Sequence, residues 1–77
     1  MSKYDGWTDD VTPKSKGWYG VNYCWDVMEG SFCSAFYFDG DDFVWGGIQY
    51  PMMNISREVF TNSDDCDDWI EDNDIGF

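Results

Sequence analysis

Residues 18–26 alternate between large apolar side chains and small or polar ones, and this alternation constrains the fold more than any other feature of the chain. Tyr19, Val21, Tyr23 and Trp25 fall on one side of such a segment. A period of two is typical of a β-strand with one buried face. The pattern therefore predicts a strand over residues 18–26, in a sheet that covers an apolar core.

A second strand is expected over residues 32–38, after a turn at Glu29 and Gly30. Both faces of this second segment are rather apolar, which favours a central position in the sheet. The segment 39–42 reads Asp-Gly-Asp-Asp. It predicts a hairpin turn, because Gly tolerates positive φ and Asp side chains accept hydrogen bonds from the nearby backbone.

Beyond this turn the pattern predicts a short third strand over residues 43–45. The diglycine at 46–47 fits either a turn into a fourth strand over residues 48–50 or a bulge in a longer third strand. Residues 51–62 are expected to form a connector. Within it, residues 54–60 fit a single helical turn or an edge strand, so the antiparallel sheet is expected within residues 18–50.

The C-terminal segment predicts a short amphipathic helix over residues 63–75. Asn62 and Ser63 are good N-cap residues, and acidic residues in the first turn suit the positive end of the helix dipole. Three apolar residues would share one face of this helix: Cys66, Trp69 and Ile70. Gly76 would serve as the C′ residue that ends the helix. The expected fold class is therefore α+β, a three- or four-stranded antiparallel β-meander with one short C-terminal acidic helix.

The segment 1–17 is expected to form an extended arm over the core, with Trp7 as its anchor, because Trp is readily buried. Nothing in the sequence marks an internal repeat or a change of composition. We therefore expect residues 1–77 to form a single small domain.

Charge restricts the class of partner. The 77 residues include 16 Asp and Glu, only 4 Lys and Arg and no His, which gives a net charge of −12. Surfaces that bind nucleic acid or anionic membranes need clustered Lys and Arg, so we expect neither nucleic-acid binding nor membrane binding. A content of 43% hydrophobic and 21% aromatic residues nevertheless predicts a folded chain rather than a disordered acidic tail.

The residue types argue against catalysis and against a cofactor or metal. The absence of His removes the commonest acid–base group and the commonest zinc ligand. The acidic clusters lack the ligand spacing of a calcium-binding loop. Cys24 and Cys33 would be bridged only if they faced each other across a hairpin. Three cysteines and an N-terminal segment without the pattern of a signal peptide favour free thiols and a cytoplasmic protein.

Acidic residues gather in two places, and both are candidate partner-binding surfaces. Crowded carboxylates repel one another, which is unfavourable. Acidic residues that served solubility alone could be spread over the surface without this repulsion. A solvated surface is the alternative interpretation. The candidate residues are six carboxylates of the predicted helix and three in the turn after the second strand: Asp64, Asp65, Asp67, Asp68, Glu71, Asp72, Asp39, Asp41 and Asp42.

Carboxylates three and four residues apart on a helix lie at a spacing similar to that of successive phosphates in nucleic acid. Such a row can occupy a groove lined by Lys and Arg, and long-range attraction would steer its binding. Trp18, Tyr37 and Trp45 would either stack on the arginines of that groove or form ordinary cover of the sheet.

In its size, its charge and the run Asp64-Asp65-Cys66-Asp67-Asp68, the chain resembles small acidic inhibitors encoded by bacteriophages and mobile elements. These include anti-restriction and anti-CRISPR proteins that act as DNA mimics. A second resemblance, to small phage-encoded β-meander domains of unassigned function, is carried by these residues: Trp7, Pro13, Gly17-Trp18-Tyr19-Gly20-Val21, Tyr37-Phe38-Asp39-Gly40 and Phe43-Val44-Trp45.

The resulting hypothesis is a non-enzymatic inhibitor that blocks a basic DNA- or RNA-binding site on a bacterial host protein. A CRISPR effector or a restriction enzyme is the favoured target, and the inhibitor would be a monomer or a small homo-oligomer in the host cytoplasm. One alternative is an interaction module that binds through exposed aromatic residues of the sheet. Another is a small structural or assembly component of a phage particle.

Overall fold

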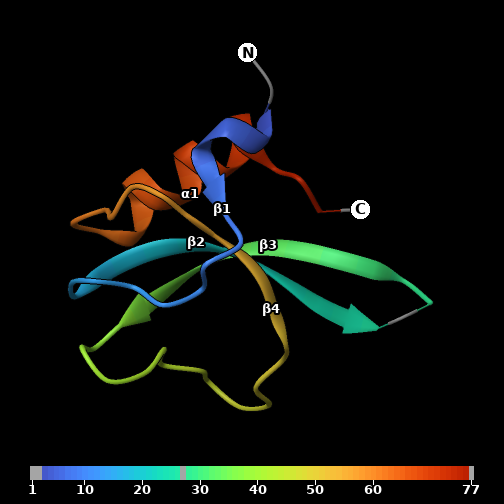
Figure 1. Ribbon diagram of the computed structural model, residues 1–77, viewed down its shortest axis with the longest axis horizontal. Helices are drawn as coiled ribbons and strands as arrows, with labels where there is room; N and C mark the ends of the chain where they lie inside the picture. The colour runs from blue at the N-terminus through green and yellow to red at the C-terminus, as the bar shows by residue number, and fades with distance from the viewer. Residues whose placement is uncertain (1–2, 27, 77) are drawn as a thin grey trace.

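The structure is a computed structural model that describes residues 3–26 and 28–76, so the first two residues of the predicted arm lie outside it. Within the described residues, four strands and one α-helix follow a short 3-10 helix (Figure 1). Their bounds are η1 Lys3–Gly6, β1 Trp7–Thr8, β2 Gly17–Asp26, β3 Gly30–Phe38, β4 Met52–Ser56 and α1 Ser63–Asn73. The predicted α+β fold class, an antiparallel sheet with one short C-terminal helix, is confirmed.

The sheet has the strand order β1-β4-β2-β3, and all three pairings are antiparallel. The long hairpin of β2 and β3 runs from Gly17 opposite Phe38 to Asp26 opposite Gly30. Gly30 has φ 93°, a conformation that glycine adopts without steric cost. Two long antiparallel strands thus form one side of the sheet, and the short β4 and β1 extend it on the other.

The predicted central position of the second strand is wrong, because among the described strands β3 lies at an edge and pairs only with β2. Its apolar side chains are covered by packing against the loop, as where Phe36 meets Trp45, and not by a second neighbouring strand.

The two faces of the sheet are covered differently. In Figure 1, η1 and α1 lie above the sheet and the segment 39–51 loops below it. Gly20, in the middle of β2, faces the helix, because a Cβ built there would lie 3.0 Å from the Trp69 ring and 3.2 Å from Ile70. Tyr19 and Val21 therefore face the loop. We call these surfaces the helix face and the loop face.

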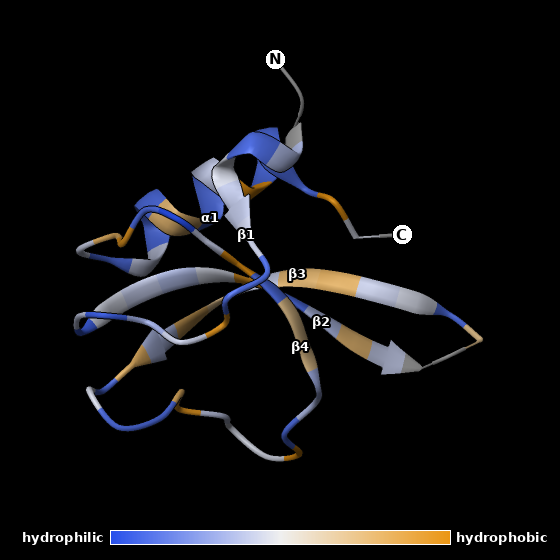
Figure 2. Cartoon of the chain, in the orientation of Figure 1, coloured by the Kyte–Doolittle hydropathy of each residue, from blue (hydrophilic) through white to orange (hydrophobic). Residues whose placement is uncertain are grey.

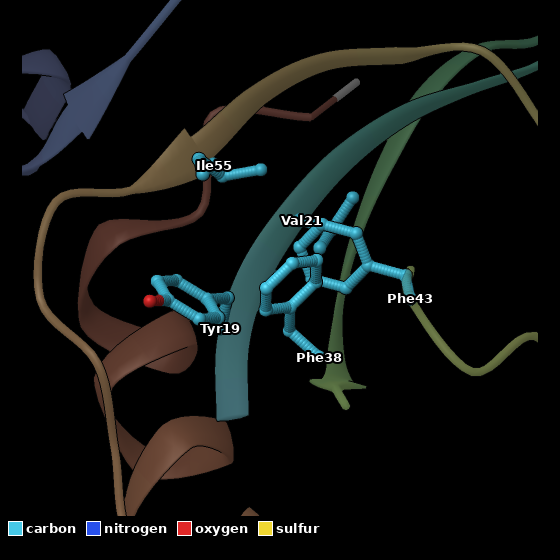
Figure 3. Close-up of a cluster of buried hydrophobic side chains, with 5 residues drawn as sticks. All are labelled: Tyr19, Val21, Phe38, Phe43 and Ile55. Atoms are coloured by element: carbon cyan, nitrogen blue, oxygen red, sulfur yellow. The ribbon is translucent and has the colours of Figure 1, made fainter. Parts of the chain in front are cut away.

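The main apolar cluster lies on the loop face. Its buried side chains come from β2, β3, β4 and the loop, as Figure 3 shows: Tyr19, Val21, Phe38, Phe43 and Ile55. The Tyr19 ring meets the rings of both Phe38 and Phe43 edge to face. The predicted alternation of β2 is thus the physical basis of the core, since Tyr19 and Val21 enter it and Tyr23 packs against it.

The segment after β3 differs from the prediction. Residues 43–45 and 48–50 form no strand, and Phe43 makes only an isolated bridge with Phe38. Phe43 is 5% exposed and belongs to the core, whereas Val44 is 53% exposed. The alternation of buried and exposed residues in this segment therefore arises because the loop inserts side chains under the sheet. It does not require pairing with a neighbouring strand.

The strand that completes the sheet comes instead from residues 51–62, predicted as a connector. β4 pairs with both β1 and β2, so it is an interior strand and not an edge strand. Its polar residue Asn54 is satisfied inside the sheet. Asn54 Oδ1 accepts a hydrogen bond of 3.0 Å from Asn22 Nδ2, and its Nδ2 donates to Asp9 Oδ1 at 2.6 Å.

Candidate functional site

Helix α1 begins where the sequence predicts. The Asn62 side chain accepts a hydrogen bond of 2.8 Å from the backbone N–H of Asp65, which caps the first turn. The helix ends at Asn73, before the predicted end at residue 75. Gly76 does not act as the C′ residue. Its backbone passes so close to β3 that a Cβ there would lie 2.7 Å from the Ser31 carbonyl oxygen.

One face of α1 is fixed against the sheet. Cys66 and Ile70 are buried, as the helical periodicity predicts. The Trp69 ring lies between two other aromatic rings, with centroids 5.0 Å from Trp7 and 5.7 Å from Phe60. The helix therefore cannot rotate without breaking aromatic contacts with the N-terminal segment.

Trp7 anchors the end of the helix as well as the arm. It is 3% exposed, and its Nε1–H donates a hydrogen bond of 2.8 Å to the backbone oxygen of Asn73. The Asn73 side chain in turn donates to the Trp69 backbone oxygen at 2.8 Å. The expected anchoring role of Trp7 is thus confirmed. The arm that carries Trp7 is not extended throughout, because it contains η1 and β1.

The opposite face of α1 carries all six predicted helix carboxylates, and every one of them is exposed. We call this set the acidic ridge: Asp64, Asp65, Asp67, Asp68, Glu71 and Asp72. Residues 63–73 contain no Lys or Arg, and Figure 2 shows hydrophilic colour along much of the helix. Eleven helical residues span about 16 Å, so the ridge carries about one negative charge per 3 Å, close to the ~3.4 Å of a single DNA strand.

The second predicted acidic patch is a structured turn on the other side of the sheet. Asp39 Oδ1 accepts hydrogen bonds of 2.9 Å from the backbone N–H groups of both Asp41 and Asp42. These bonds, with a smaller contribution from Lys16, lower the pKa of Asp39 below its ordinary value. The Asp42 side chain accepts from the N–H of Phe43. Two of the three carboxylates therefore stabilise the turn, and the ridge is the stronger candidate surface.

The aromatic residues proposed to stack on a partner lie in packed surroundings. Trp18 contacts Tyr37 edge to face at 5.5 Å, and Trp45 packs on Phe36 with ring centroids 4.4 Å apart. All three proposed residues, Trp18, Tyr37 and Trp45, are partly buried.

The exposed aromatic side chains of the sheet are instead Trp25 and Phe32. The period-two pattern places both residues on strands, but it does not indicate that the loop below the sheet leaves the turn end of the β2–β3 hairpin uncovered.

The thiols are poorly suited to chemistry. All three cysteines are free, and Cys33 lies opposite Asn22 in the sheet register rather than opposite Cys24. Burial is the main cause that raises the pKa of Cys33 to about 11 and that of Cys66 to about 12. Within residues 3–26 and 28–76, no group of three or more His, Cys, Asp or Glu residues is arranged to hold a metal ion.

A hollow of about 350 Å³ lies between the arm and the segment after β4. It is lined by two basic residues, Lys14 and Arg57, and by the carboxylate-bearing Asp10. Asp10 is occupied locally, since its Oδ1 accepts from the N–H of Thr12. Arg57 Nε donates to the backbone oxygen of Asp5. Because charges of both signs line the hollow and two of them are already engaged, it offers no concentrated charge to a ligand.

Comparisons with protein-family models, with curated proteins and with solved structures give no match to this chain. Among the residues that the structure describes, no helix is both long enough and apolar enough to cross a membrane. The function of the chain is therefore inferred from its acidic and aromatic surfaces.

Proposed function

We propose that this chain is an acidic inhibitor that mimics nucleic acid and occupies a basic DNA- or RNA-binding site on another protein. The observation that carries the proposal is the acidic ridge, a row of exposed carboxylates on a helix whose other face is packed against the sheet. Carboxylates that are already held in place lose little conformational entropy when they bind a partner, whereas a flexible acidic tail would lose much more. Its charge density resembles that of a polynucleotide strand.

The position of the ridge on the helix supports a role other than folding. Glu71 and Asp72 lie in the last turn, where the helix dipole favours positive charge, and that turn contains no basic residue. The contacts of Trp69 and Ile70 with the sheet offset this unfavourable electrostatic term. Carboxylates that oppose the stability of their own helix are more simply explained by selection for binding.

The partner proposed on these grounds is a host protein with a groove lined by Lys and Arg. A CRISPR effector or a restriction enzyme in the bacterial cytoplasm is the favoured class, because their nucleic-acid channels are extended basic surfaces. The inhibitor would need no cofactor and no catalytic group, since occupation of the groove is enough to exclude DNA.

Charge reversal tests the proposal. The triple variant Asp67→Lys, Asp68→Lys, Glu71→Lys changes the net charge from −12 to −6, because each reversal adds two units. A matched control reverses three exposed carboxylates outside α1 and outside the second acidic patch: Asp5, Asp10 and Glu58. Partners would be captured from a bacterial lysate at low and at high salt. Competition between the captured partner's DNA and each variant would then be measured by fluorescence polarisation.

Mimicry predicts that the ridge variant binds its partner at least a hundredfold more weakly, whereas the control loses much less. It also predicts that added DNA displaces the wild-type chain and that binding weakens steeply with salt. Lys in the last helical turn favours the dipole, so the ridge variant should fold at least as well as the wild type. Equal losses for both triple variants would contradict a role for the ridge and favour net charge alone.

A further inference from the structure

An aromatic hollow lies near the turn that joins β2 to β3, on the loop face. Tyr23 and Phe32 are directly opposite each other in the register, and Trp25 follows on the same side. These three side chains line an open hollow of about 240 Å³. Trp25 is 49% exposed and Phe32 is 40% exposed, values well above those of the core aromatics.

The rings of the hollow are held in place by Tyr50 of the loop. The Trp25 Nε1–H donates a hydrogen bond of 2.9 Å to the Tyr50 hydroxyl oxygen. The Tyr50 ring stacks on Tyr23 with centroids 5.5 Å apart and planes inclined by 26°. Trp25 meets Phe32 at 5.4 Å and 78°, edge to face. The polar group of the exposed indole is therefore already satisfied inside the protein, and the hollow offers π-faces without a competing donor.

The electrostatic surroundings favour a cation. Residues 17–56 contain no Lys or Arg, so no basic side chain of this hairpin or loop can occupy the hollow. Glu29, in the turn of the hairpin, is exposed. Aromatic faces attract cations through the ring quadrupole, and a neighbouring carboxylate adds to that attraction.

The shape of the hollow distinguishes between cations. A quaternary ammonium group gains most when several rings enclose it, and this hollow is open to solvent on one side. A guanidinium group is flat and weakly hydrated, stacks on a ring face, and keeps its N–H edges free for water or a carboxylate. The open hollow, with its three rings, therefore fits the guanidinium group of arginine better than a methylated ammonium group.

We propose that Tyr23, Trp25 and Phe32 form a binding site for the guanidinium group of an arginine side chain on a partner protein. The site does not depend on the acidic ridge, since the ridge belongs to α1 on the helix face and the hollow opens on the loop face. Arginine binding here and groove binding by the ridge can therefore fail separately.

The test uses N-acetyl-arginine methylamide as the probe and the wild-type chain labelled with ¹⁵N. The Trp25 indole N–H, assigned with the Trp25→Leu variant, reports on the hollow directly. We expect a saturable shift of this signal with the arginine probe and no saturable shift with N-acetyl-citrulline methylamide. Citrulline has nearly the same shape as arginine but carries no charge, so the pair isolates the contribution of the cation.

Variants supply the second measurement, in which the Phe32 and Tyr23 backbone amides report binding. Trp25→Leu should weaken arginine binding about two- to fivefold, as expected for loss of one ring from an exposed cation–π site. Trp25→Phe, which keeps a ring, should retain part of the affinity. The ridge variant Asp67→Lys, Asp68→Lys, Glu71→Lys should bind the probe within about twofold of the wild type, because long-range attraction between exposed charges is screened by salt.

Three outcomes would overturn the proposal. The first is equal shifts with arginine and citrulline, and the second is unchanged affinity in Trp25→Leu. The third is tighter binding of tetramethylammonium than of the arginine probe, which would reject guanidinium as the ligand class. Thermal unfolding of each variant, followed by circular dichroism, distinguishes a lost ring from a lost fold.

Discussion

The indole ring of Trp7 lies against that of Trp69, with ring centroids 5.0 Å apart and planes inclined by 51°. This contact joins β1, at one edge of the sheet, to the helix that carries the acidic ridge. Because Trp7 also donates a hydrogen bond to the backbone of Asn73, one buried side chain fixes both the packed face and the end of α1.

Replacing Trp69 with Ala should release the helix from the sheet. The substitution removes ring contacts with Trp7 and Phe60 and leaves a cavity beside Gly20. Trp69 is only partly buried, so we expect a loss of about 3 kcal/mol in the free energy of unfolding, the low end for a large aromatic residue. Urea denaturation followed by tryptophan fluorescence would measure it. A loss below about 1 kcal/mol would show that α1 is not held by this ring.

Gly20 is the point of closest approach between β2 and α1. A Cβ added there would meet Trp69, Ile70 and Trp7 at 3.0, 3.2 and 3.3 Å. Gly20→Ala should therefore cost about 1–3 kcal/mol through overpacking.

Gly47→Ala is the matched control for Gly20→Ala, because a Cβ at residue 47 meets nothing within 4 Å. The control should be neutral or slightly stabilising, since Ala reduces the entropy of the unfolded chain. Thermal melts of the two variants decide the prediction, and equal melting temperatures would refute it.

Asp39 should make stability depend on pH. The backbone N–H groups of Asp42 and Asp41 lower its pKa in the folded state, so the ionised carboxylate is favoured by folding. Its contribution is fully present above the unfolded pKa of ~3.9 and is lost as the pH falls through the lower folded value. Asp39→Ala should therefore lower the melting temperature at pH 7, and this difference should diminish toward pH 2.

Asp41→Ala provides the control for this pH dependence. Asp41 is exposed, and its role in the turn is to donate its backbone N–H, which alanine retains. Its melting temperature should follow that of the wild type across the same pH range. If both variants lose the same stability at pH 7, net charge and not the hydrogen-bonded turn is responsible.

The Cys33 and Cys66 thiols should resist alkylation in the folded protein. Burial raises their pKa values to about 11 and about 12, so almost no thiolate is present at pH 8. Iodoacetamide labelling followed by peptide mass spectrometry should show slow modification of both residues, and rapid modification after unfolding in urea. Rapid labelling of native Cys66 would contradict its burial.

The same raised pKa values affect stability at high pH. The neutral thiols contribute stability below the ordinary thiol pKa, and this contribution is lost as the pH rises toward the folded values.

Sequence periodicity predicted the parts of the fold that depend on local patterns. The alternation of Tyr19, Val21 and Tyr23 predicted β2 because these side chains do enter one core. The Asn62 cap and the apolar positions of α1 predicted the helix and its exposed carboxylates for the same reason. Each of these predictions depended only on the sequence of one segment and on the face that this segment buries.

The strand β4 could not be predicted in the same way, because its pairing depends on residues far away in the chain. Asn54 is a polar residue that the sequence alone does not favour inside a sheet. It is accommodated there because Asn22 and Asp9, both distant in the chain, form hydrogen bonds with its side chain. Phe43 alternates like a strand residue although it only inserts into the core from a loop. For the surface, the sequence could not show which aromatic residues the loop would leave uncovered, and Trp25 and Phe32 became candidates only in the folded chain.

The strand order also determines when the protein can finish folding. A chain emerging from the ribosome can pair β2 with β3 as soon as Phe38 is free, but β1 has no neighbour until Ser56 has been synthesised. Trp7 must wait longer still, for Trp69 and Asn73. Trp7 is thus synthesised before either of these partners, so its large indole stays without them while residues 8–68 are translated.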